Sequence, residues 1–177
     1  MVARAVAFRP EIGKYWPNGK VLKVRFLGGT EADRAKVRKY ATEWSEVANI
    51  RFLFIEKGSS DLRVSFTSGL GTWSLIGTDA SLVPQDKATI NFGWFNARLP
   101  ESDCRAAVLH EFGHVLGFPD CYVEFFDSRD GLMVNYYIDT SNLMCSRSGQ
   151  VLPTHYEQLK TTYSRLQKSN FFDFLRP

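Results

Sequence analysis

Hydrophobic residues recur with two different periods in the first third of the chain. From Lys20 to Leu27, apolar and polar residues alternate one by one, which predicts a half-buried strand. From Thr30 to Ala48, apolar residues recur every three or four positions, which predicts a helix with one buried stripe. The stripe consists of Val37, Tyr40, Ala41, Trp44 and Val47. Thr30 and Asp33 have the spacing of a capping box, although Glu or Gln is more usual at the second position.

The rest of the chain predicts short strands, a second helix and an irregular half. Four runs between turn residues are expected to be strands: Ile50–Ile55, Leu62–Phe66, Trp73–Gly77 and Thr89–Phe92. The second helix is expected to begin after an N-cap at Ser102 or Asp103 and to run to Leu116. Gly117–Ser148 is expected to be mostly irregular, and Thr154–Gln167 to form a last helix.

This order of elements predicts an α+β fold. We expect a twisted mixed β-sheet with a long backing helix, an active-site helix on the floor of a cleft, and an irregular C-terminal subdomain ending in a helix. The 177 residues suit a single domain, with an N-terminal subdomain of about 1–117 and a C-terminal one of about 118–177. No apolar run approaches the roughly 20 residues of a membrane span. The net charge of +3 comes from scattered Lys and Arg, which argues against nucleic-acid binding. We expect a monomer.

The second helix ends in the most informative stretch of the chain, His110-Glu-Phe-Gly-His-Val-Leu-Gly-Phe-Pro-Asp120. Histidines four residues apart lie on one face of a helix, so His110 and His114 can bind the same ion. Glu111 can reach a water on that ion and act as a general base. Gly117 suits a sharp turn at the helix end, and Asp120 then supplies a third, oxygen ligand. Three ligands with one open position are typical of a catalytic Zn²⁺ site.

Three other residues compete with Asp120 for the place of third ligand. His155 is the one remaining histidine, and it is expected on the surface of the first turn of the last helix. Glu157 could be a distant glutamate ligand, as in the other large H-E-x-x-H clan, although that clan has no need of the glycine turn. Glu124 is close in sequence and is expected to be solvated. Asp120 therefore remains the preferred third ligand.

Several stretches resemble known zinc peptidases. The pattern H-E-x-x-H-x-x-G, with a third ligand three residues later, is the metzincin signature. With aspartate in the third place, HEFGHVLGFPDCY looks most like the snapalysins. Thr72–Ala80 (TWSLIGTDA) and Ala88–Phe95 (ATINFGWF) are similar to segments upstream of the zinc helix in bacterial and fungal astacin-like domains. Ser141–Cys145 (SNLMC) is a candidate Met-turn, with Met144 under the metal.

The resemblance implies a secreted zinc metalloendopeptidase of the EC 3.4.24 type that acts on protein or peptide substrates. An edge strand over the cleft would pair with the substrate backbone by β-augmentation. The residues expected in this role are Trp73, Ser74, Leu75, Ile76 and Gly77. Arg147, just after the Met-turn, is expected in the wall of the pocket beyond the scissile bond, where it would favour Asp or Glu.

The chain departs from the astacin-like pattern at two places. Cys121 replaces the glutamate that would pair with a matured N-terminus, which puts that form of activation in doubt. Ser146 replaces a tyrosine that helps to hold the oxyanion, and Tyr122 is a candidate substitute, with a packed loop aromatic as its other interpretation. The metzincin arrangement would bring Cys121 and Cys145 together, so a disulfide between them is one alternative and reduced, buried thiols are the other. Cys104 would then stay free.

Two other functional classes are compatible with the motif. A catalytically silent domain could use the cleft to hold a peptide, although Glu111 argues against it. A structural zinc site is the second, but such sites are usually four-coordinate and rich in thiolates. We expect no signal peptide within this sequence, because its first apolar stretch is short and is interrupted by Arg4 and Arg9. The chain is then expected to be a trimmed secreted form, a protein delivered by a leaderless route, or a cytosolic protein. Three acidic residues of the expected irregular half could bind calcium, although a solvated loop is the simpler interpretation: Asp127, Asp130 and Asp139.

Overall fold

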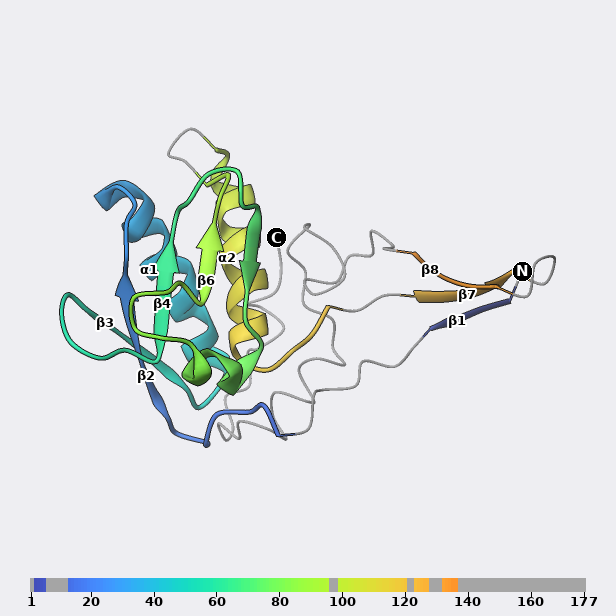
Figure 1. Ribbon diagram of the computed structural model, residues 1–177, viewed down its shortest axis with the longest axis horizontal. Coiled ribbons are helices and arrows are strands. Elements are labelled where there is room, and N and C mark those ends of the chain that lie inside the picture. The colour runs from blue at the N-terminus through green and yellow to red at the C-terminus, as the bar shows by residue number, and fades with distance from the viewer. Residues whose placement is uncertain (1, 6–12, 96–98, 121–122, 128–131, 137–177) are drawn as a thin grey trace.

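The computed structural model describes residues 2–5, 13–95, 99–120, 123–127 and 132–136 (Figure 1). The body contains two long helices, five strands and a short 3₁₀ helix. In chain order these are β2 (Val21–Phe26), α1 (Glu31–Val47), β3 (Arg51–Ile55), β4 (Leu62–Ser65), β5 (Thr72–Ser74), η1 (Gly77–Leu82), β6 (Ile90–Phe92) and α2 (Glu101–Val115). The expected α+β class is confirmed.

One mixed sheet forms the frame of the body. Its strands lie in the order β3-β2-β4-β6-β5, and only β5 runs antiparallel to its neighbour. The α1 helix contacts β3 and the α2 helix contacts β5, so the two helices lie side by side along the sheet (Figure 1). The core between these layers joins Leu22 and Val64 of the sheet to Val108 and Phe112 of α2. The sequence expectation of a mixed sheet with a long backing helix is confirmed.

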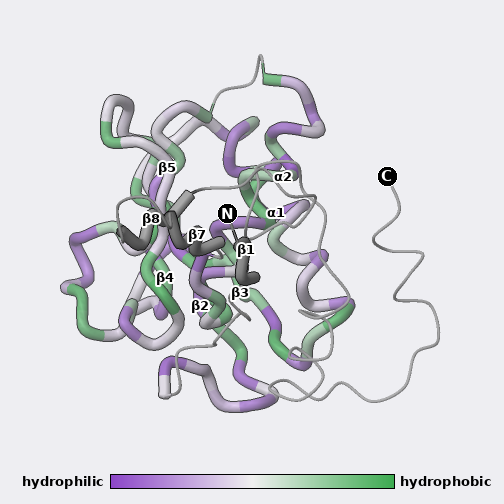
Figure 2. The backbone as a smooth tube through the Cα atoms, turned by 90° about the vertical axis from the view of Figure 1, so that its right-hand side faces the viewer, coloured by the Kyte–Doolittle hydropathy of each residue, from purple (hydrophilic) through white to green (hydrophobic). Residues whose placement is uncertain are grey.

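The first helix begins and packs as its sequence pattern predicts. Thr30 is the N-cap, and Thr30 and Asp33 bond each other reciprocally as a capping box. Four of the five stripe residues are buried, and Val47 is partly buried against the same core. Hydrophobic and hydrophilic stretches therefore alternate along α1 (Figure 2). A shorter carboxylate at the second box position is thus sufficient to close the box.

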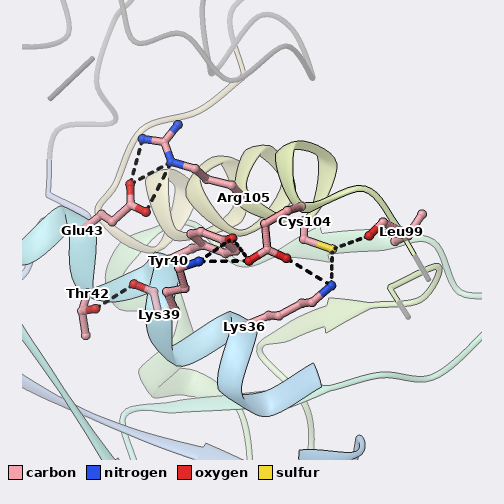
Figure 3. A network of polar contacts seen from close by, with 9 residues as sticks. Lys36, Lys39, Tyr40, Thr42, Glu43, Leu99, Cys104 and Arg105 are labelled. Carbon is pink, nitrogen blue, oxygen red and sulfur yellow. Dashed lines mark hydrogen bonds and ion pairs between the residues drawn. The ribbon is translucent and has the colours of Figure 1, made fainter. Parts of the chain in front are cut away.

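The start of the second helix differs from the prediction. Its N-cap is Pro100, whereas Ser102 and Asp103 lie within the first turn and bond each other. The Pro100 side chain makes no capping bond, and the Pro100 carbonyl oxygen accepts from the backbone N–H groups of Asp103 and Cys104. Glu101, the first residue of the helix, accepts bonds from Tyr40 and from Lys39 of α1 (Figure 3). These charged contacts fasten the start of α2 to α1.

A fully buried arginine holds the loop that follows the edge strand. The Arg63 guanidinium on β4 donates to the carbonyl oxygens of Ala80 at 2.9 Å, Val83 at 3.1 Å and Lys87 at 2.9 Å, and also to those of Ser60 and Asp61. Burial lowers the pKa of Arg63, and the nearby charge of Arg25 acts in the same direction. Nothing in the sequence pattern distinguishes Arg63 from a surface arginine.

A second, three-stranded antiparallel sheet is formed by β1 (Val2–Ala5), β7 (Val123–Asp127) and β8 (Leu132–Tyr136). The expectation that Gly117–Ser148 is mostly irregular is therefore wrong for the ten residues of β7 and β8. Both runs are rich in β-branched and aromatic residues and flank a segment that ends in Asp130-Gly131, which is a hairpin signal. The predicted last helix, Thr154–Gln167, lies outside the described residues. Within the part that is described, neither helix is long and apolar enough to cross a membrane.

Candidate active site

The end of α2 turns sharply at Gly117. This residue has a φ of +97°, in the left-handed region that strongly favours glycine. A Cβ at this position would also lie 2.7 Å from the ring of Tyr15. Gly117 is therefore required both by the backbone turn and by the close approach of a ring from the N-terminal part of the chain.

The turn places a carbonyl group beside the second histidine. The Phe118 carbonyl oxygen lies 2.6 Å from Nδ1 of His114. Since a carbonyl can only accept, Nδ1 carries a proton, and Nε2 is the ring nitrogen left to face a metal ion. This contact fixes the orientation of the His114 ring, and its carbonyl partner could not be identified from residue spacing alone.

Three donor atoms converge beyond the turn. Nε2 of His114 lies 3.1 Å from Nε2 of His110. Oδ1 of Asp120 lies 3.3 Å from Nε2 of His110 and 3.4 Å from Nε2 of His114. Donor atoms placed at zinc's usual bond lengths of about 2.0–2.1 Å, in tetrahedral directions, are roughly 3.3 Å apart. The residues therefore fit one small tetrahedral cation with nitrogen and oxygen ligands.

The two carboxylates of the site are in different electrostatic states. Burial acts to raise the pKa of Asp120, but hydrogen bonds and charges from both histidines outweigh it and hold that pKa well below its usual range. Burial raises the pKa of Glu111, against the opposing influence of the His114 and His110 charges. Glu111 is 4% exposed, and its Oε2 has no hydrogen-bond partner among the described residues. A buried carboxylate with one oxygen atom that accepts no hydrogen bond, next to a group of metal-binding donors, is a strong candidate for a group that moves a proton.

The edge strand β5 lies directly against this helix (Figure 1). The Ser74 hydroxyl donates to the backbone carbonyl oxygen of Glu111 at 2.9 Å. On its sheet side, β5 is joined to β6 through bonds from Gly93 to Gly71 and from Leu75 to Thr89. Backbone groups alternate in direction along a strand, so those of Thr72 and Ser74 point to the outer edge. Among the described residues, no strand pairs with that edge.

A buried asparagine shapes the loop that leads into β5. The Asn91 side chain bonds to the backbone of Thr67 and, at 2.6 Å, to the carbonyl oxygen of Gly71. A Cβ on Gly93 would lie 2.4 Å from that same Gly71 oxygen. These contacts explain why an N-x-G pattern on β6 accompanies the edge strand, a relation that the sequence alone does not reveal.

The structure places the remaining predicted residues as follows. The predicted strand Trp73–Gly77 is shorter than expected, because β5 ends at Ser74 and Gly77 begins η1. Gly77 has positive φ, which is incompatible with continuing the strand. Cys104 is a buried free cysteine, as expected. Several predicted residues lie outside the described ranges: Cys121, Tyr122, Asp130, Asp139, Met144, Cys145, Arg147, His155 and Glu157.

Comparisons with known proteins identify solved structures with a similar fold. A scan against protein-family models and a search of curated proteins found no match. A solved structure of myroilysin matches with a TM-score of 0.72 and 30% identity, over 86% of this chain and 83% of that one. A second myroilysin structure matches with a TM-score of 0.62 and 36% identity, over 91% and 69% of the two chains. A hatching enzyme zinc-protease from the medaka fish Oryzias latipes, with a TM-score of 0.42 and 16% identity over 66% and 55%, is too distant to carry an argument.

Proposed function

The chain belongs to the astacin-like metzincin proteases, and from that premise we propose that it is a zinc-dependent endopeptidase acting on proteins. The observation that carries this proposal is the convergence of His110, His114 and Asp120 beside the buried carboxylate of Glu111. A metal ligand set next to a general base is what metal-assisted hydrolysis of an amide uses.

We assign the zinc ligands to Nε2 of His110, Nε2 of His114 and the carboxylate of Asp120. The chemistry that zinc supplies when bound is polarisation of the scissile carbonyl and a lower pKa for a bound water. Asp120 removes one positive charge that a third histidine would leave at the site, so the bound water would be less acidic than in a three-histidine site.

Glu111 acts as the general base in this proposal. Its unpaired Oε2 accepts the proton of the attacking water and afterwards donates it to the leaving amine. The raised pKa of Glu111 supports this role, because a more basic carboxylate accepts a proton from water more readily. A catalytically silent binding domain would have no use for such a buried, unpaired carboxylate.

The substrate would bind along β5. An extended peptide can pair with the outward N–H and C=O groups of Ser74, and its side chains would then lie next to Trp73, Leu75 and the start of η1 at Gly77. Because Ser74 also bonds the backbone of Glu111, the strand that binds the peptide and the base that acts on it are fixed to each other. Ile76, the residue before η1, completes the predicted substrate strand.

Three further roles rest on the family resemblance. We propose Met144 as the Met-turn methionine, Tyr122 as an oxyanion donor, and Arg147 as a determinant of specificity beyond the scissile bond. The same resemblance supports action outside the producing cell, by secretion or another route.

The test is metal analysis of the purified protein, combined with a casein cleavage assay with and without a chelator. We expect about one zinc per chain, loss of cleavage on chelation and recovery on addition of zinc. Zinc that is bound without any cleavage would point to a silent or structural site. Cleavage that survives complete removal of metal would contradict the proposal.

A further inference from the structure

A short segment near the N-terminus contacts both halves of the candidate site. We call residues Lys14–Trp16 the strap. They precede β2 and are far in sequence from both α2 and η1. Hydrogen bonds nevertheless join them to the end of α2 and to the turn after β5. Neither the sequence motif nor the assigned site residues include any part of this segment.

On one side the strap holds the end of the metal-binding helix. The indole Nε1 of Trp16 donates to the carbonyl oxygen of Val115 at 2.8 Å, and Trp16 is 5% exposed. Val115 is the last residue of α2, where carbonyl groups lack partners within the helix. Tyr15 packs edge-on against Phe118 with ring centroids 6.5 Å apart, and its ring also lies against Gly117. The strap therefore contacts the residue whose carbonyl fixes the His114 ring.

On its other side the strap holds the end of the substrate strand. The Thr78 N–H donates to the Lys14 carbonyl oxygen at 2.9 Å, and the Lys14 ammonium lies 2.8 Å from the Asp79 carboxylate. The approach is so close that a Cβ on Gly77 would lie 1.8 Å from the Lys14 oxygen. The three residues of the strap thus contact both the start of η1, which follows β5, and the turn that leads to Asp120.

We propose that the strap is a positioning element of the active site, and that Trp16 and Tyr15 set the geometry of the metal ligands through Phe118. The side chains of Tyr15 and Trp16 hold the turn at Gly117. The Phe118 carbonyl oxygen then accepts a hydrogen bond from Nδ1 of His114, which orients Nε2 toward His110 and Asp120. The proposal rests on the proposed zinc site and goes beyond it, because it assigns a role to residues that touch neither metal nor substrate.

The chain offers a matched control for the test. Trp44 of α1 also donates its indole Nε1 to a carbonyl oxygen of α2, that of Leu109 at 3.0 Å, and it is similarly buried. Trp16→Phe and Trp44→Phe each remove one buried indole hydrogen bond to α2. The Trp16 bond lies at the end of α2 before the turn at Gly117, and the Trp44 bond joins α2 to α1. Each variant is compared with the wild type by chelator competition for zinc, by the visible spectrum of the cobalt(II) form, and by kcat and KM on a peptide.

We expect Trp16→Phe to raise the zinc Kd about tenfold, to change the cobalt spectrum and to lower kcat with little effect on KM. Trp44→Phe should lower the unfolding temperature while zinc Kd, spectrum and kcat stay within about twofold of the wild type. Tyr15→Leu, which keeps the indole bond but removes the ring contact to Phe118, should weaken zinc binding as well; it also decides the question if Trp16→Phe does not fold.

Zinc binding that is unchanged in Trp16→Phe, or in Tyr15→Leu alone if the first variant does not fold, would overturn the strap as a positioning element. An equal loss in Trp44→Phe would do the same, because the effect would then belong to the whole helix. A wild-type protein that neither binds zinc nor cleaves casein would instead contradict the proposed function, so the two failures are distinguishable.

Discussion

The α2 helix carries two glutamates, ten positions apart, whose pKa values move in opposite directions. The side chain of Glu101 in the first turn is 55% exposed, and hydrogen bonds from Tyr40 and Lys39 lower its pKa to about 2. Glu111 near the other end is buried, and burial raises its pKa. Hydrogen bonds therefore favour the ionised form of Glu101, whereas burial favours the protonated form of Glu111, which a group that carries a proton must be able to adopt.

The largest expected effect is a loss of kcat when one of the two glutamates, Glu111, is replaced. Glu111→Ala should keep zinc and fold but lower kcat by about 10²–10⁴-fold, because the residue is a base and not a ligand. Glu101→Ala, the matched control, should leave kcat within about twofold and lower only the unfolding temperature. Cleavage of casein and the zinc content of both purified variants measure this. A Glu111→Ala protein that cleaves at close to the wild-type rate would refute the assignment.

A second prediction distinguishes the proposed metal ligand Asp120 from the proposed general base Glu111 by the zinc content of the variants. Asp120→Ala should lose most of its bound zinc, whereas Glu111→Ala should retain it. His155→Ala and Glu157→Ala should also retain zinc, because neither is expected to be a ligand. Metal content after dialysis is the measurement, and an equal loss in His155→Ala would transfer the site to another clan.

A third prediction concerns acid stability at the exposed end. Because the pKa of Glu101 is lower in the folded state, its ionised form stabilises the fold above its ordinary pKa of 4.5. That contribution is lost as the pH falls from 4.5 to about 2. Wild type should therefore be more stable than Glu101→Gln near neutral pH, and the gap in unfolding midpoint should shrink through this window. A gap that does not change with pH would show that the contacts of Glu101 do not depend on its charge.

The smallest expected effect concerns a charge outside the described residues. Arg147 is predicted to favour Asp or Glu immediately after the cleaved bond, through paired hydrogen bonds to the substrate carboxylate. Arg147→Ala should lower the preference for acidic residues a few-fold and leave the cleavage of apolar sites unchanged. Profiling with a peptide library measures this, and an apolar preference that is the same in both proteins would exclude the role.

The sequence predicted the elements that depend on local spacing. The capping box at Thr30, the buried stripe of α1 and the edge position of β5 depend on neighbouring residues or on a known motif, and all were found. The N-cap at Pro100 was missed because proline starts a helix without a side-chain bond. The hairpin of β7 and β8 was not predicted, because the residues of both strands were assigned to an irregular half.

Other features of the site arise from contacts between distant segments. The Tyr15 ring on Gly117, the Asn91 amide on Gly71 and the Trp16 indole on Val115 each join residues from different elements. No periodicity in the sequence encodes such pairs, because each depends on how the sheet and helices pack. The motif thus indicated which atoms converge but not what holds them in place.

The anchoring of the η1 loop by Arg63 has a consequence for how this region can change during evolution. Every bond that Arg63 donates to the loop ends on a main-chain carbonyl, and all residue types provide that group. The loop can therefore exchange its side chains, such as the exposed Leu82, without losing its attachment to the sheet. The surface of the loop is therefore free to diversify beside β5, whereas position 63 itself must keep a guanidinium.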